Sequence, residues 1–109
     1  MVQPDTIVAV ATPPGTSAVA VIRLSGPDAF SIVSRICPEL PEKREYRKVL
    51  LARAGDPETD ESLDQVLVTL FPGLDSYTGE DVAEISGHGG WLPPVLILEA
   101  CVRAGARRA

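Results

Sequence analysis

Residues 18–37, AVAVIRLSGPDAFSIVSRIC, decide the fold class of this 109-residue chain. Residues 18–24 are rich in Val and Ile and, at period two, predict a strand with Val19, Val21 and Arg23 on one face. In the following Ser-Gly-Pro-Asp, Pro27 suits the first helical position and Asp28 meets the positive end of the helix dipole. A helical stripe with spacing i, i+3, i+4, i+7 and i+8 comes next: Ala29, Ile32, Val33, Ile36 and Cys37. A strand followed directly by an amphipathic helix indicates helices packed against a sheet.

The segments on either side of this stretch supply more strands. Residues 7–11 form a short apolar run that predicts a buried strand, and residues 12–17, with two prolines and a glycine, predict the break after it. Residues 47–54 and 63–71 predict two strands of a hairpin joined by an acidic, solvated loop. In the second of these, alternation places Val66, Val68 and Leu70 on one face.

The last third of the chain predicts a strand, a loop and a second helix. After a turn at residues 72–76, residues 81–86 predict a short strand and residues 87–90 a tight loop. Residues 93–104 predict a helix that is apolar around most of its circumference, capped by Gly105. Its polar positions, Glu99 and Arg103, have the favourable i, i+4 spacing. Residues 106–109 leave room only to begin a strand, so we expect a piece of a longer protein.

This element order predicts an α+β domain, a mixed or antiparallel sheet with two main helices on one side. The net charge of −5 argues against a nucleic-acid-binding surface spread over the domain, and no apolar run is long enough for a membrane span. Cys37 and Cys101 are too few for a disulfide framework or a zinc site. We interpret them as a reduced, buried pair in a cytosolic protein.

Two groups of residues are candidates for binding. Arg23 and Glu84 are charged residues within otherwise apolar strands; they pair with each other, lie on a solvated face, or line a ligand pocket. In a pocket, a carboxylate accepts two N–H bonds from a planar edge such as a pterin's, and a guanidinium holds a ligand carboxylate or carbonyl.

The second candidate is the glycine-rich segment of residues 87–90. It is either a turn needing positive φ or a loop whose N–H groups meet a ligand at a helix N-terminus. His88, the only histidine, is favoured as a loop residue that bonds to backbone. No Walker-type phosphate loop or dinucleotide fingerprint is present.

Several sequence blocks, taken together, are specific. They are DTIVA (residues 5–9), ATPPG (11–15), IRLSG (22–26), SYTGEDV with Glu84 (76–84) and GHGG (87–90). In this order they resemble the N-terminal domain of the MnmE (TrmE) family of tRNA-modifying GTPases. The resemblance implies that residues 1–109 are a folate-binding and homodimerisation domain. It further implies a fold like the tetrahydrofolate-binding domain of glycine-cleavage T-type proteins, with two subunits corresponding to one duplicated domain.

The same resemblance implies the ligands and the site. The cofactor would be 5-formyltetrahydrofolate or another one-carbon tetrahydrofolate, and Arg23 and Glu84 match family positions that contact it. Our own hypothesis places Glu84 on the pterin edge and Arg23 on a polar group of the folate. From the residues themselves, His88, Gly89 and Gly90 are candidates for a pocket loop, and we expect no metal ligand and no catalytic residue. Thr16 and Ser17 stand where the family commonly has a basic residue and a glycine, and a family lysine that contacts folate lies in a segment beyond residue 109. The two alternatives are a pocket formed within residues 1–109 and a pocket that also needs the later lysine segment.

For the whole protein, the resemblance implies a cytoplasmic, potassium-stimulated GTPase. With the flavoprotein MnmG, it would modify the wobble uridine of tRNA. GTP, magnesium and potassium would belong to a GTPase domain outside this sequence. We therefore expect the fragment alone to be inactive, with no direct contact to nucleic acid or membrane. Two alternatives are half of a folate-dependent aminomethyltransferase, which should be longer and repeated, and a structural dimerisation module without folate binding.

Overall fold

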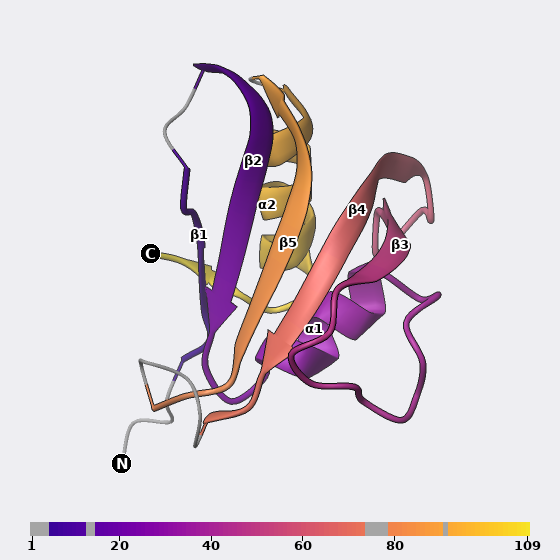
Figure 1. The fold of residues 1–109 in the computed structure, drawn as a ribbon. Coiled ribbons are helices and arrows are strands. Elements are labelled where there is room, and N and C mark those ends of the chain that lie inside the picture. Colours follow the sequence, from indigo (N-terminus) through magenta and orange to yellow (C-terminus); the bar gives the residue numbers. More distant parts are fainter. Residues whose placement is uncertain (1–4, 13–14, 74–78, 91) are drawn as a thin grey trace.

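The computed structural model describes residues 5–12, 15–73, 79–90 and 92–109. Across these residues a six-stranded sheet is covered on one face by two helices (Figure 1). The elements in chain order are β1 (Ile7–Val10), β2 (Gly15–Ser25), α1 (Ala29–Ile36), β3 (Leu50–Gly55), β4 (Ser62–Phe71), β5 (Val82–Gly90), α2 (Leu92–Arg103) and β6 (Arg107–Arg108).

The sheet is mixed, with strand order β3-β4-β5-β2-β1-β6. Neighbouring strands are antiparallel except β1 and β6, which are parallel. The predicted α+β class, with two helices on one side of the sheet, is confirmed. The hairpin of β3 and β4 is also confirmed, because Leu51 lies opposite Leu67 in the ladder.

The core lies between the sheet and the two helices, as the alternation predicted. Val66, Val68 and Leu70 of β4 are buried, while Leu67 between them is exposed. All five residues of the predicted helical stripe are buried, and burying each large apolar side chain contributes about 1.5–3 kcal/mol. Cys37 and Cys101 are free thiols in this core, and burial raises the pKa of each to about 12. The predicted burial of both cysteines is therefore confirmed, and neither thiol is ionised near neutral pH.

The corner between β2 and α1 differs from the prediction. The helix begins at Ala29, so Pro27 precedes the N-cap Asp28 instead of opening the helix. The N–H of Asp28 donates to Oγ1 of Thr6 at 2.8 Å, which holds β1 against the start of α1. Gly26, with φ +143°, allows this approach, because a Cβ there would lie 2.5 Å from the Cα of Thr6.

The end of α2 is capped as predicted. Gly105 has φ +122° and its N–H donates to the carbonyl of Val102, while the N–H of Ala106 donates to that of Cys101. These two bonds are a Schellman motif, and it directs the chain into β6 beside β1.

The polar side chains of α2 do not pair with each other, although their spacing favours it. Arg103 binds Asp56 of the acidic loop at 2.5 Å, and Glu99 binds Arg108. The helix is also buried on one side only, because Ile97 is buried and Val95 is exposed.

Some strand boundaries also differ from the prediction. β3 begins at Leu50 instead of residue 47, because Arg47 has φ +59° and its N–H turns to the carbonyl of Leu70. β2 begins at Gly15, inside the predicted break. Residues 13–14 of that break lie outside the described residues, as do residues 74–78, which belong to the predicted turn and to the SYTGEDV block. No helix within the described ranges is long and apolar enough to span a membrane.

Candidate functional site

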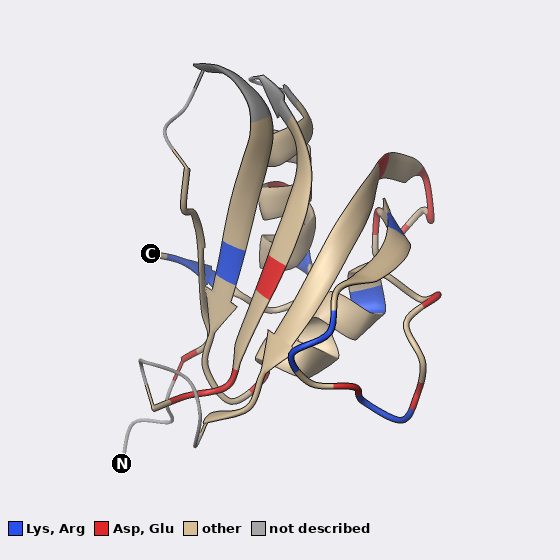
Figure 2. Ribbon diagram, viewed as in Figure 1, with Lys and Arg blue, Asp and Glu red and all other residues tan. Residues whose placement is uncertain are grey.

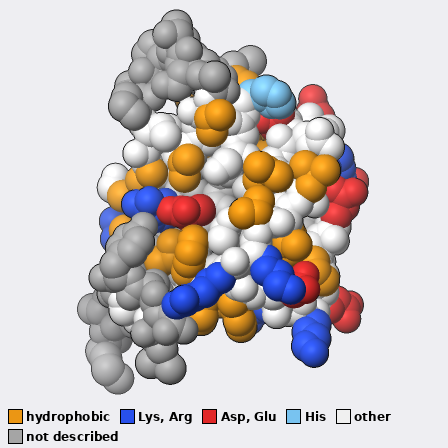
Figure 3. All heavy atoms as spheres, in the orientation of Figure 1, with side chains coloured by type: hydrophobic (Ala, Val, Ile, Leu, Met, Phe, Trp, Pro, Cys, Tyr) orange, Lys and Arg blue, Asp and Glu red, His pale blue; other side chains and the backbone are white. Residues whose placement is uncertain are grey.

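Among the described residues, no helix or strand covers the face of the sheet opposite the two helices (Figure 1), and we call it the open face. Figure 3 shows apolar side chains gathered on it around charged groups. Three of its large apolar side chains, Val19, Leu51 and Leu67, are each at least 44% exposed. Its residues alternate with the core positions of four strands: Val19, Val21, Arg23, Leu51, Gln65, Leu67, Thr69, Glu84, Ser86 and His88.

Arg23 and Glu84 form an ion pair on the open face. They are register partners in the two central strands, where Figure 2 shows a basic and an acidic segment side by side. Nε and a terminal nitrogen of Arg23 both donate to Oε2 of Glu84, at 3.0 and 2.7 Å. The two side chains are 36% and 25% exposed. Of the alternatives left open by the sequence, mutual pairing on a partly solvated face is what the structure shows.

This ion pair is suited to exchange with a ligand. Both bonds from Arg23 end on Oε2, so they occupy only one of the two carboxylate oxygens of Glu84. A partly exposed pair of this kind contributes about 0–1 kcal/mol to stability. A ligand that supplies N–H donors to Glu84 and an acceptor to Arg23 would therefore displace little folding energy.

The Gly-His-Gly-Gly segment was predicted as a tight loop, and this prediction is wrong. β5 continues to Gly90, with Gly87 opposite Ala20, His88 opposite Val19 and Gly90 opposite Gly15. Gly87 is needed for space and not for a turn. A Cβ at this position would lie 2.9 Å from Oδ2 of Asp64.

Asp64 occupies the space that Gly87 leaves, and there it holds His88. Its Oδ2 accepts the backbone N–H of His88 at 3.0 Å, and its Oδ1 lies 2.7 Å from Nδ1 of the imidazole. Burial opposes ionisation of Asp64, but bonds from the His88 backbone, the His88 ring and the Gln65 N–H outweigh it, so its pKa lies below the usual range. Of the two alternatives left open for this segment, the one in which its N–H groups meet a ligand is not supported at His88, because the His88 N–H already donates to Asp64.

Sequence reasoning missed Asp64, because it counted this residue with the acidic residues of the predicted solvated loop, whereas Asp64 lies inside β4. A signal was nevertheless present. Asp64 has the same parity along its strand as Val66 and Val68, so alternation places a carboxylate on the inward side of the sheet. An acidic side chain at an inward position needs a partner nearby.

A cavity of about 310 Å³ lies on the open face beside this histidine. Its lining comes from all four strands of that face: Val19, Leu51, Gln65, Val66, Leu67, Ser86, Gly87 and His88. Arg23 and Glu84 are not part of it. The structure thus brings the predicted site residues together in two places along β5. At one, Arg23 meets Glu84; at the other, His88 borders the cavity. Gly89 and Gly90 only continue the strand.

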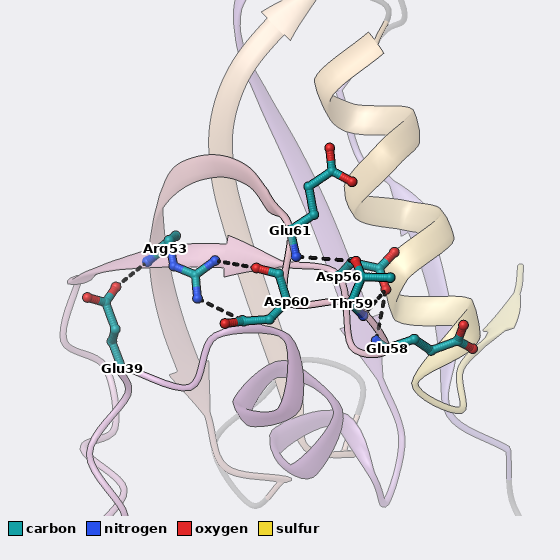
Figure 4. A network of polar contacts seen from close by, with 7 residues as sticks. All are labelled: Glu39, Arg53, Asp56, Glu58, Thr59, Asp60 and Glu61. Carbon is teal, nitrogen blue, oxygen red and sulfur yellow. Dashed lines mark hydrogen bonds and ion pairs between the residues drawn. The ribbon is translucent and has the colours of Figure 1, made fainter.

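The acidic loop between β3 and β4 has its own polar network, drawn in Figure 4. The guanidinium of Arg53 donates to the carbonyl and Oδ1 of Asp60, and the backbone N–H of Arg53 donates to Glu39. Oδ1 of Asp56 accepts the N–H groups of Glu58 and Thr59. These bonds order the loop itself. Nowhere in the described part of the chain do three or more His, Cys, Asp or Glu side chains gather to hold a metal ion.

Comparison with known proteins identifies a matching family and several similar proteins. Residues 6–109 match the family described as "GTP-binding protein TrmE N-terminus". A protein of Chloroflexus aurantiacus named "tRNA modification GTPase MnmE" is 49% identical over 106 residues, which cover 96% of this chain and 23% of the relative. Proteins of the same name from Halorhodospira halophila and Bdellovibrio bacteriovorus are 47% and 45% identical over 105 residues, covering 96% of this chain and 22% of each relative. The chain thus spans less than a quarter of the length of these relatives.

Proposed function

The chain belongs to the family of TrmE N-terminal domains, and from this premise we propose that it is a tetrahydrofolate-binding and homodimerisation domain of a tRNA modification GTPase. The ligand is 5-formyltetrahydrofolate or another one-carbon tetrahydrofolate. The whole protein acts in the cytoplasm with an MnmG-type flavoprotein on the wobble uridine of tRNA. GTP, magnesium and potassium are bound by a domain outside residues 1–109, so this domain by itself is inactive.

The observation that carries the folate proposal is the Arg23–Glu84 pair on the open face. The carboxylate of Glu84 suits the paired N–H donors of a pterin's amide-and-amine edge, which is a bidentate arrangement. Arg23 lies beside it and presents donors to a polar group of the same ligand. The low cost of opening this partly exposed pair supports its use for binding.

Uncovered apolar side chains support the homodimer. Tyr46, Val49 and Leu51 are exposed, and the last two lie at or beside β3, which is an edge strand of the sheet. An edge strand with exposed apolar residues favours association with another chain. The proposed likeness to glycine-cleavage T-type proteins fits this arrangement, because two copies would correspond to one duplicated domain.

The test is calorimetric titration with 5-formyltetrahydrofolate, a stable one-carbon folate, together with sedimentation equilibrium. We expect a dimer and saturable heat at about one ligand per chain. Glu84→Lys should weaken binding at least about 100-fold, because it replaces a bidentate acceptor with a like charge beside Arg23. Glu58→Lys, the same charge reversal in the exposed acidic loop, is the matched control and should bind normally.

Unchanged affinity in folded Glu84→Lys would contradict the assigned pocket. A dimer without heat, both in this chain and in one extended past residue 109 to include the lysine segment, would favour the structural dimerisation module. Heat that appears only in the extended chain would support the folate site and show that residues 1–109 hold part of it.

A further inference from the structure

Basic side chains gather on the connection between α1 and β3, at residues 43–48 (Lys-Arg-Glu-Tyr-Arg-Lys), which we call the basic loop. Figure 2 shows basic stretches on this connection, and Figure 3 shows basic side chains along a border of the open face. Building on the proposed function in tRNA modification, we propose that the basic loop binds single-stranded RNA. Its cations contact phosphates, and Tyr46 stacks on a base.

The charges of the domain are separated along one strand. The basic loop has four basic residues and one acidic residue, a net charge of +3, although the whole chain carries −5. The acidic loop lies at the other end of β3, and the six residues of this strand separate the two loops by roughly 20 Å. At physiological ionic strength, salt screens charges beyond about 8 Å. The net charge of the whole domain therefore does not exclude RNA at the basic loop.

Aromatic contacts hold the basic loop in place while its four basic residues remain exposed. The rings of Tyr46 and Phe30 have centroids 5.7 Å apart, and the guanidinium carbon of Arg44 lies 5.3 Å from the Phe30 centroid. Lys48 lies 3.6 Å from Glu45, in an exposed pair that contributes little and can be exchanged for a phosphate. An ordered loop of this kind loses less conformational entropy on binding than a flexible one.

The exposed aromatic ring favours RNA over an acidic polypeptide as the partner. Tyr46 is 44% exposed, although its ring also packs against Phe30. Proteins that bind single-stranded nucleic acid combine a positively charged surface with aromatic rings on which bases stack. The carboxylates of an acidic polypeptide would use the cations but not the ring.

The basic loop lies close to the proposed folate contacts. Arg47, at φ +59°, donates its N–H to the carbonyl of Leu70 at 2.8 Å. Leu70 is the register partner of Ala83, which precedes Glu84 on β5. Two strand spacings, roughly 10 Å, therefore separate Arg47 from this part of β5. RNA held by the basic loop would thus have a base within reach of a folate on the open face.

The test follows binding of a fluorescein-labelled RNA hairpin with a uridine-containing loop, by fluorescence anisotropy at several salt concentrations. We expect saturable, micromolar binding that weakens as salt rises. Lys43→Gln/Lys48→Gln should weaken binding about tenfold and reduce the slope of log affinity against log salt by about 1.4, because each phosphate contact on a single strand contributes about 0.7. Tyr46→Leu should weaken binding at least about fivefold with little change in this slope, because a stacking contact is lost and no charge.

Arg35→Gln/Arg107→Gln removes the same charge from exposed positions on α1 and β6, and it is the matched control that should bind RNA normally. Thermal melting checks that every variant is folded. Equal weakening in the control, or no RNA binding at low salt, would overturn the RNA surface while leaving the folate proposal in place. Polyglutamate that competes as well as RNA would also overturn it, in favour of an acidic protein partner. RNA binding without any heat from 5-formyltetrahydrofolate would contradict the folate site alone.

Discussion

The two faces of the sheet are made from the same strands, yet one face is packed against the helices and the other is partly exposed. On the covered face, Ala83 and Ile85 of β5 are completely buried against the helices. On the open face, Glu84 lies between them in sequence and remains partly exposed beside Arg23. Because strand alternation separates the two sets, packing on one face constrains the other very little. The fold is therefore stabilised mainly by the covered face, and the proposed ligand contacts lie on the open face.

The strongest test of this difference removes one large side chain from each face. Ile85→Ala should lower the free energy of unfolding by about 3 kcal/mol, because it leaves a cavity in the core. Leu67→Ala, on the exposed side of the neighbouring strand, should lower it by about 0.5 kcal/mol or less. Urea unfolding followed by circular dichroism measures both. Similar losses for the two variants would show that the open face is also part of the packed core.

A smaller effect is expected where the two faces meet, at Asp64. Its pKa is lower in the folded protein than in the unfolded chain. The stability that Asp64 contributes is therefore fully present above the ordinary carboxyl pKa of about 3.9, and is lost as pH falls through the folded pKa. At pH 7, Asp64→Asn should be less stable than the original chain by about 1–2 kcal/mol. Urea midpoints from pH 7 downward should converge in acid, and a constant difference would contradict the assigned hydrogen bonds.

The smallest effect should come from the Arg23–Glu84 pair, considered for stability alone. A double-mutant cycle with Arg23→Ala, Glu84→Ala and the combined variant should give a coupling energy below about 1 kcal/mol. Added salt should reduce it further, because the pair is partly exposed. A salt-insensitive coupling above about 2 kcal/mol would instead make the pair a structural element, and would weaken the argument that it exchanges with a ligand.

Much of the fold could be predicted because the decisive contacts are local or periodic. The helical stripe ending at Cys37 and the alternation of Val66, Val68 and Leu70 report directly which side is buried. Gly105 was recognisable as a cap, since only a residue that tolerates positive φ ends a helix in this way.

The rest depended on partners distant in sequence. In the sequence alone, Gly87 is typical of a turn. The structure shows that a glycine is needed there because the side chain of Asp64 fills the space beside it. Glu99 and Arg103 have the spacing of a pair, but Arg108 and Asp56 are better placed to bind them. Arg23 and Glu84 could be identified from the sequence as charged residues within apolar strands. That they lie opposite each other could not be predicted, because it depends on β2 and β5 being neighbours in the sheet.

The pairing of β2 with β5 also has a consequence for how the chain folds. β1 with β2, and β3 with β4 and β5, join segments that are neighbours in sequence, so each group can form through short loops. The contact between Arg23 and Glu84 instead joins residues separated by 61 positions. Closing that loop loses conformational entropy before packing repays it, and contacts of high contact order are typically slow to form. The pairing of β2 with β5, which carries the proposed binding site, should therefore form late, together with the still longer-range pairing of β1 with β6, and should limit the folding rate.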